Sequence, residues 1–247
     1  MHFACRQFHI GDACVPGLFL FNRGMNMFLG HFGVGFGAKA IARKVSLGTL
    51  MLAAQFIDLL WPTFLLMGIE IVRIAPGATA VTPLLFEHYP VSHSLLAVLC
   101  WAMLVGGVHF YQRRNYKAAL VLCFLVVSHW LLDLIVHQPD LPLYPGSAAV
   151  MGLNLWASLP ATLAVEVTLF VLGIWLYARV TMPTDNSGKW GLWGLTGILA
   201  VIYAGNLFGP LPTSSEAIAW AGQAQWLLVI WGYWLDKHRT TVVSRSE

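Results

Sequence analysis

Three side chains that can bind a metal or a proton recur at steps of four in one apolar stretch. Residues 121–140 read VLCFLVVSHWLLDLIVHQPD and include His129, Asp133 and His137. In an α-helix, steps of four place side chains on one face. An ionisable group inside a membrane span is costly, which makes it a functional candidate. The stretch therefore predicts a hydrophobic helix with a stripe of groups that bind a cation or relay protons.

Two further positions have the same character. Asp58 stands alone in a long apolar segment, where a carboxylate must be protonated, paired or metal-bound. His93 follows Ser92, which can cap a helix and leave His93 in its first turn. Such a helix start also attracts anions, for example a phosphate.

Each candidate also has a structural reading. Asp58 can be a protonated hydrogen-bond donor to a neighbouring helix, and the HxxxD pair of His129 and Asp133 can hold two helices together without binding an ion. His31 and His88 can be ordinary interface histidines. We interpret the remaining polar candidates as residues that would orient the metal ligands: Ser92, Ser94, His137 and Glu166.

The composition is typical of a polytopic membrane protein. Of the 247 residues, 58% are hydrophobic and 10% are charged, whereas charged residues make up about 25% of soluble domains. The net charge is only +3 and there is no basic run, so we expect the lipid bilayer and not nucleic acid as a partner. The four cysteines form no CxxC pair and do not favour a disulfide framework.

The apolar segments predict an all-α fold, a transmembrane helical bundle of about six to seven spans. The segments are residues 27–42, 46–72, 91–111, 117–137, 159–178, 191–209 and 217–235. Gly33 and Gly37 have the GxxxG spacing that lets a neighbouring helix approach closely. Pro62 predicts a kink in the second segment.

The chain divides into three parts. Residues 1–24 do not fit the pattern that follows, and we interpret them as an N-terminal extension from a start codon placed too early. Residues 25–146 form the membrane core that carries the His and Asp candidates. Residues 147–247 are expected to add three transmembrane helices and a basic tail.

Lysine and arginine predict the orientation. Ten of the fourteen follow the first, third and fifth segments or lie in the C-terminal tail, which would place the C-terminus in the cytoplasm of a bacterium. Residues 73–90, 138–158 and 210–216 would then face the periplasm. The candidate histidines would converge on the outer half of the inner membrane. Asp58 and His88 would lie about 15–20 Å apart in depth unless a kink at Pro62 and the 73–90 loop brought them together.

The order of these residues resembles the bacterial membrane-bound metal-dependent hydrolase family, the YdjM-like inner-membrane proteins. The resemblance covers roughly residues 27–146 and rests on His31, Asp58, HYPVSHS at 88–94, SHWLLD at 128–133 and LPLYP at 141–145. His88, Ser92, His93 and Ser94 match a family motif HRGxTHS, in which Tyr89 and Pro90 replace Arg and Gly. Where the family has PDxD, this chain has Gln55 to Asp58 and retains only the second acid.

The resemblance implies the activity class of a metal-dependent hydrolase and no substrate. Because zinc suits His and carboxylate ligands, we expect zinc as the divalent metal. A site in the outer half of the membrane would take a lipid, a phosphoester or a periplasmic small molecule as substrate. The metal ligands would be His31, His88, His93, His129 and Asp133, and Asp58 would be the catalytic base. Two alternatives stay open. The same groups could form a metal or proton path in a transporter, or the protein could be a non-catalytic membrane assembly factor whose histidines join helices.

Overall fold

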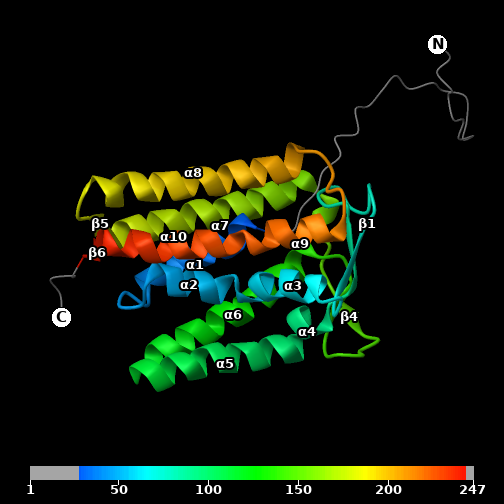
Figure 1. Cartoon of the computed structure of the whole chain (residues 1–247), viewed down its shortest axis with the longest axis horizontal. Helices are drawn as coiled ribbons and strands as arrows, with labels where there is room; N and C mark the ends of the chain where they lie inside the picture. Colours follow the sequence, from blue (N-terminus) through cyan, green and yellow to red (C-terminus); the bar gives the residue numbers. More distant parts are fainter. Residues whose placement is uncertain (1–27, 243–247) are drawn as a thin grey trace, which may run out of the picture.

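The computed structural model describes residues 28–242, and their fold is a bundle of helices with three small two-stranded sheets at its ends (Figure 1). The predicted extension, residues 1–24, lies outside the described residues. The α-helices are α1 (Leu29–Gly37), α2 (Leu47–Ala54), α3 (Phe56–Leu66), α4 (Pro90–His93), α5 (Leu95–Arg113), α6 (Tyr116–Val136), α7 (Leu159–Val180), α8 (Asn186–Phe208), α9 (Ser215–Gln223) and α10 (Gln225–Lys237). Two 3₁₀ turns, η1 (Ala38–Ala40) and η2 (Leu155–Ala157), connect longer elements.

Short polar side chains define where several helices start. Ser46, Ser94 and Asn115 each accept a hydrogen bond from the backbone N–H three residues later, at the first turns of α2, α5 and α6. Such caps satisfy N–H groups that have no partner within the helix. The starts of these helices are therefore encoded locally, by single residues.

Within residues 28–242, four helices are long and apolar enough to cross a membrane: α5, α6, α7 and α8. The bent pair of α2 and α3 makes a fifth if it counts as one span. The prediction of six to seven spans was therefore too high. Segment 27–42 forms the short helix α1 and the turn η1, and segment 217–235 breaks at Ala224 into α9 and α10. Helix α1 is mostly buried among other helices.

The predicted kink lies at a different residue. Helices α2 and α3 meet at 58°, and the break falls at Gln55. Pro62 lies inside α3, where it packs closely against Gly222 of α9. The bend places Asp58 in the first turn of α3.

Glycines allow α1 and α7 to pack with their backbones almost in contact. A Cβ atom at Gly33 would lie 2.5 Å from the carbonyl oxygen of Leu169, and one at Gly173 would lie 2.0 Å from the carbonyl oxygen of Gly33. The close approach predicted from the GxxxG spacing thus occurs at Gly33, and α7 is the neighbouring helix.

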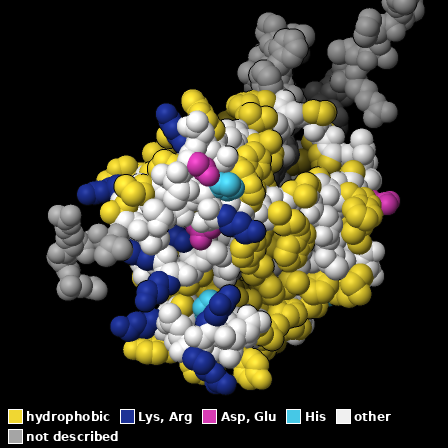
Figure 2. All heavy atoms as spheres, turned by 60° about the vertical axis from the view of Figure 1, so that its left-hand side comes forward, with side chains coloured by type: hydrophobic (Ala, Val, Ile, Leu, Met, Phe, Trp, Pro, Cys, Tyr) yellow, Lys and Arg dark blue, Asp and Glu magenta, His cyan; other side chains and the backbone are white. Residues whose placement is uncertain are grey.

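The two ends of the bundle differ. Strands β1 (Ile71–Ile74) and β2 (Leu84–His88) pair antiparallel, and with the short strands β3 (Leu141–Pro142) and β4 (Val150–Met151) they form the end that also carries α4 (Figure 1). Strands β5 (Thr181–Pro183) and β6 (Arg239–Thr241) pair at the opposite end. Lys and Arg side chains gather over that second end (Figure 2). An ion pair between the buried Lys39 and the partly buried Asp236, 3.0 Å long, joins η1 to α10.

Candidate metal centre

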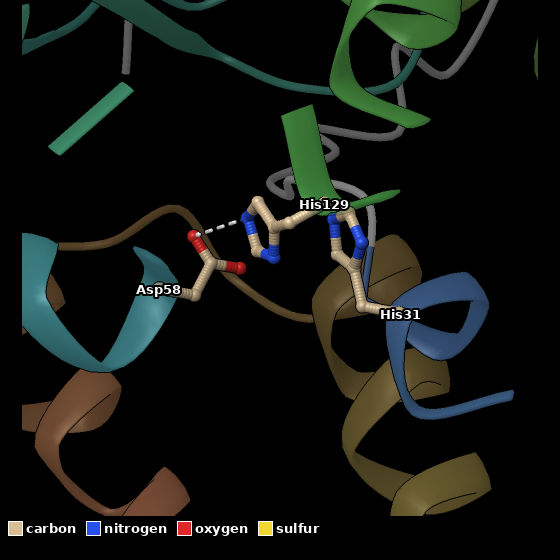
Figure 3. Close-up of side chains that lie close together, drawn as sticks. All are labelled: His31, Asp58 and His129. Carbon is tan, nitrogen blue, oxygen red and sulfur yellow. Dashed lines mark ion pairs between the residues drawn. The ribbon is translucent and has the colours of Figure 1, made fainter. Parts of the chain in front are cut away.

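Five ionisable side chains from four helices meet inside the bundle, toward the end that carries α4. They are His31 of α1, Asp58 of α3, His93 of α4, and His129 and Asp133 of α6. None is more than 7% exposed. Figure 3 shows three of them, with the ring of His129 between the carboxylate of Asp58 and the ring of His31.

The distances between their ligand atoms suit a shared ion. Nε2 of His129 lies 3.6 Å from Oδ1 of Asp58 and 3.3 Å from Oδ2 of Asp133. Nε2 of His93 lies 3.6 Å and 3.8 Å from the same two oxygens. These separations exceed an ordinary hydrogen bond. They are close to the roughly 3.4 Å that separates two ligand atoms of a tetrahedral ion at about 2.1 Å.

Two groups of three residues within the described chain could hold a metal ion, with ligand atoms within 4.8 Å of one another. They are His31, Asp58 and His129, and His93, His129 and Asp133. His129 belongs to both groups. Within the described residues its Nε2 has no hydrogen-bond partner, and neither has Oδ2 of Asp133. Buried polar atoms are normally paired, so these two are suited to bind a ligand.

The bend at Gln55 supplies the acceptor that orients His129. Nδ1 of His129 lies 2.8 Å from the carbonyl oxygen of Ala54, the last residue of α2. A carbonyl oxygen only accepts, so Nδ1 must carry a proton and donate it. In the neutral ring, Nε2 then has its lone pair free toward the two carboxylates. A histidine that binds a metal is usually held in this way.

A second chain of hydrogen bonds orients His93. The hydroxyl of Ser92 donates to Glu70 at 2.7 Å and lies 2.6 Å from Nδ1 of His93. Since its hydrogen is directed to Glu70, the hydroxyl oxygen accepts from Nδ1, and Nε2 of His93 is again the free atom. Glu70 is itself fixed by the backbone N–H groups of Val91 and Ser92 at the start of α4.

His31 completes the cluster. Its Nε2 lies 3.2 Å from Oδ1 of Asp133, and its ring stacks on that of His129 with centroids 3.7 Å apart and planes 5° apart. Two imidazolium rings at this separation would repel each other strongly. The stacked pair therefore favours at most one protonated ring, and it is compatible with two neutral metal ligands.

The charge of the site is also compatible with a bound metal cation. Asp58 and Asp133 are both buried, and within residues 28–242 their ion pairs are with histidines only. Two buried carboxylates need positive charge close by. Protons on the histidines or a metal cation can supply it.

His88, which was predicted to be a metal ligand, lies outside this cluster. It is exposed at the end of β2, opposite Ile71 in the ladder. The expected separation in depth between Asp58 and His88 therefore does not bear on the cluster. His93, five residues later, reaches Asp58 instead.

The other predicted residues have local roles. His137 pairs with Asp140 at 2.9 Å and packs against Trp156, and Ser94 caps α5. The hydroxyl of Tyr89 also donates to Asp140 at 2.8 Å, and burial together with this carboxylate raises the pKa of Tyr89 above its ordinary value.

Glu166 of α7 binds the start of α1. Its Oε2 accepts hydrogen bonds from the backbone N–H groups of Phe28 at 3.0 Å and Leu29 at 2.9 Å. It thus caps a helix from a different part of the chain. Because His31 lies two residues after Leu29, Glu166 fixes the position of that ligand without touching it.

Two polar residues near the site were missed by the sequence analysis. Glu70 is 2% exposed and supports His93 through Ser92. Gln55 is fully buried at the bend, and both of its amide atoms lack a hydrogen-bond partner within the described chain. The signal for both was an isolated polar residue in or at the end of an apolar segment, the same signal that identified Asp58.

Replacing Ser92 by alanine is expected to weaken metal binding by roughly 10–100-fold, because the ring of His93 would lose the group that fixes its orientation. The measurement is a metal titration of the purified protein against a competing chelator. The matched control is Ser128→Ala, since Ser128 also precedes a site histidine but donates to Leu125 of its own helix. Equal affinities for the two variants would contradict the role of Ser92.

No protein-family model, curated protein or solved structure matches this chain. The fold and the site alone therefore define its class. It is a helical protein with several helices able to cross a membrane, and it has a buried His and Asp cluster whose geometry could hold a metal ion.

Proposed function

We propose that the protein is an integral-membrane, metal-dependent hydrolase that binds zinc in the His and Asp cluster. His93, His129 and Asp133 would be the principal ligands, with His31 as a further ligand. The observation that carries the proposal is the set of free, correctly spaced ligand atoms, two of them on rings whose Nδ1 positions are already fixed. The resemblance to the bacterial membrane-bound hydrolases supports the same activity.

When bound, zinc would polarise a water molecule and the reacting oxygen of the substrate. Asp58 is the most exposed member of the cluster, at 7%, and its Oδ1 contacts both His93 and His129. We assign it the role of general base, which accepts a proton from water. The other four residues are at most 3% exposed, so they would position the reaction and exclude bulk solvent.

The arrangement of charge supports a periplasmic location for the site. Lys and Arg gather at one end of the bundle (Figure 2), which by their usual preference would be cytoplasmic, together with the C-terminus. The cluster lies toward the other end. In a bacterial inner membrane it would meet lipid-like substrates of the outer leaflet or small periplasmic molecules, with an ester or phosphoester bond.

The near-complete burial of the cluster also favours a second candidate, a transporter that moves a metal ion or protons. Its path would have to continue toward the basic end, where His109 is the histidine that lies in a span. The distances between ligand atoms suit a resident ion, and we therefore place hydrolysis first.

The test uses the full chain, purified in detergent with and without chelator treatment. Metal content is measured by elemental mass spectrometry. Hydrolysis is assayed on a panel of carboxylic-ester and phosphoester amphiphiles. We expect stoichiometric zinc, and hydrolysis that is lost on chelation and restored by zinc. Flux of zinc or protons into proteoliposomes without hydrolysis would assign the transporter instead. A protein that takes up no divalent metal would refute both metal-dependent readings.

A further inference from the structure

A second polar site lies toward the basic end of the bundle and shares no residue with the metal centre. It is a cleft of about 620 Å³ between the start of α2, the end of α5, the start of α6 and the side of α10. Its polar lining includes Lys44, Ser46, His109, Arg113, Asn115 and Tyr233. The proposed hydrolase uses none of these residues, and His109 is the one of them that a transporter path would use.

The charge of the cleft is positive and uncompensated. No acidic residue lines it. The side chains of Lys44 and Arg113 are exposed, and within the described chain neither forms an ion pair. By contrast, Lys39 close by is buried and paired with Asp236. The two lining cations are thus available to an anion, whereas their buried neighbour is not.

Two helices also begin at the cleft. Ser46 and Asn115, the capping residues of α2 and α6, are both part of the lining. The start of a helix carries a partial positive charge and adds to the attraction for an anion. The cations and the helix starts therefore act in the same direction.

Part of the wall is apolar. Leu52, Val108 and Leu122 line the cleft from α2, α5 and α6, and α5 and α6 are long enough to span a membrane. A ligand that fits both the basic and the apolar part of the cleft has a negatively charged group attached to a hydrocarbon part. Basic pockets between transmembrane helices at the membrane surface commonly bind such lipid headgroups.

We propose that this cleft binds the phosphate group of an anionic phospholipid, with Lys44 and Arg113 as the principal contacts. The phosphate would lie near the starts of α2 and α6, and the first part of the acyl region would contact Leu52 and Val108. This inference is independent of the metal centre, because it involves neither the same residues nor the same end of the bundle.

The test compares two double variants of the full chain by native mass spectrometry. Lys44→Gln with Arg113→Gln removes both lining cations. The matched control, Lys117→Gln with Lys189→Gln, removes two cations from the same end that do not line the cleft. Each protein is titrated with phosphatidylglycerol and with phosphatidylcholine, and inorganic phosphate is added as a competitor.

We expect the first variant to bind phosphatidylglycerol about thirtyfold more weakly than the unmodified protein, at about 1 kcal/mol per cation. The control variant should bind it nearly as well as the unmodified protein. Displacement of the lipid by inorganic phosphate would retain the phosphate site but assign soluble phosphate as its source. Equal affinities of the two variants, or equal binding of the two lipids by the unmodified protein, would overturn the proposal. Metal content reports separately on the other site.

Discussion

Replacing His129 or Asp133 by alanine is expected to abolish metal binding. Nε2 of His129 belongs to both groups that could hold an ion, and the carboxylate of Asp133 contacts three histidines. Losing a ligand should cost more than the roughly 10–100-fold in affinity expected for a residue that only orients one. Elemental analysis of the purified variants gives the result directly, and hydrolytic activity should fall with metal content.

The matched control is His88→Ala, since His88 was also predicted to be a ligand but is exposed on β2. It should retain the full metal content. Asp133→Asn keeps the size of the side chain while removing its charge, and it separates loss of a ligand from loss of the fold. Both variants must elute as folded protein in size-exclusion chromatography. Full zinc in folded His129→Ala and Asp133→Asn would rule out the proposed centre.

The second large effect is expected from Gly173→Ala. Alanine in place of glycine inside a helix normally stabilises it by about 0.5–1 kcal/mol. Here the added Cβ would lie 2.0 Å from the carbonyl oxygen of Gly33, so α1 and α7 must move apart. Overpacking typically costs about 1–3 kcal/mol. We expect the upper part of that range, because backbone cannot rotate out of the way as a side chain can.

Thermal unfolding in detergent measures this effect, with Gly197→Ala in α8 as the control, since an added Cβ there meets nothing within 4 Å. The control should be as stable as the unmodified protein or more so. Gly173→Ala should also bind metal more weakly, since α1 carries His31. If the two variants melted at the same temperature, the close packing of α1 on α7 would be refuted.

Most of the site could be predicted from the sequence because ionisable residues stand out in apolar segments. The spacing of His129 and Asp133 placed both on one face of a helix, and Asp58 and His93 were recognised as isolated polar groups. The structure brings all of them together with His31. The sequence could not show that His88 lies apart from the others, because its place at the exposed end of β2 depends on the pairing of that strand with β1.

The number of spans could not be predicted for a different reason. Hydropathy measures whether a segment avoids water, and burial among helices satisfies that requirement as well as lipid does. Helix α1 is apolar because α2, α6 and α7 surround it. The hydrogen bond from His129 to the carbonyl of Ala54 was also outside the reach of sequence patterns, since every residue has a carbonyl.

At the bend at Gln55, the carbonyl group of Ala54 can serve either a continuous helix or the ring of His129. If residues 47–66 formed one straight helix, the carbonyl of Ala54 would accept from the N–H of its own helix, and His129 would lose its acceptor. Substitution of Gln55 by a strong helix former is therefore expected to raise the thermal stability of the protein and to weaken its metal binding. Thermostability screens on this protein should be scored by metal content as well as by melting temperature.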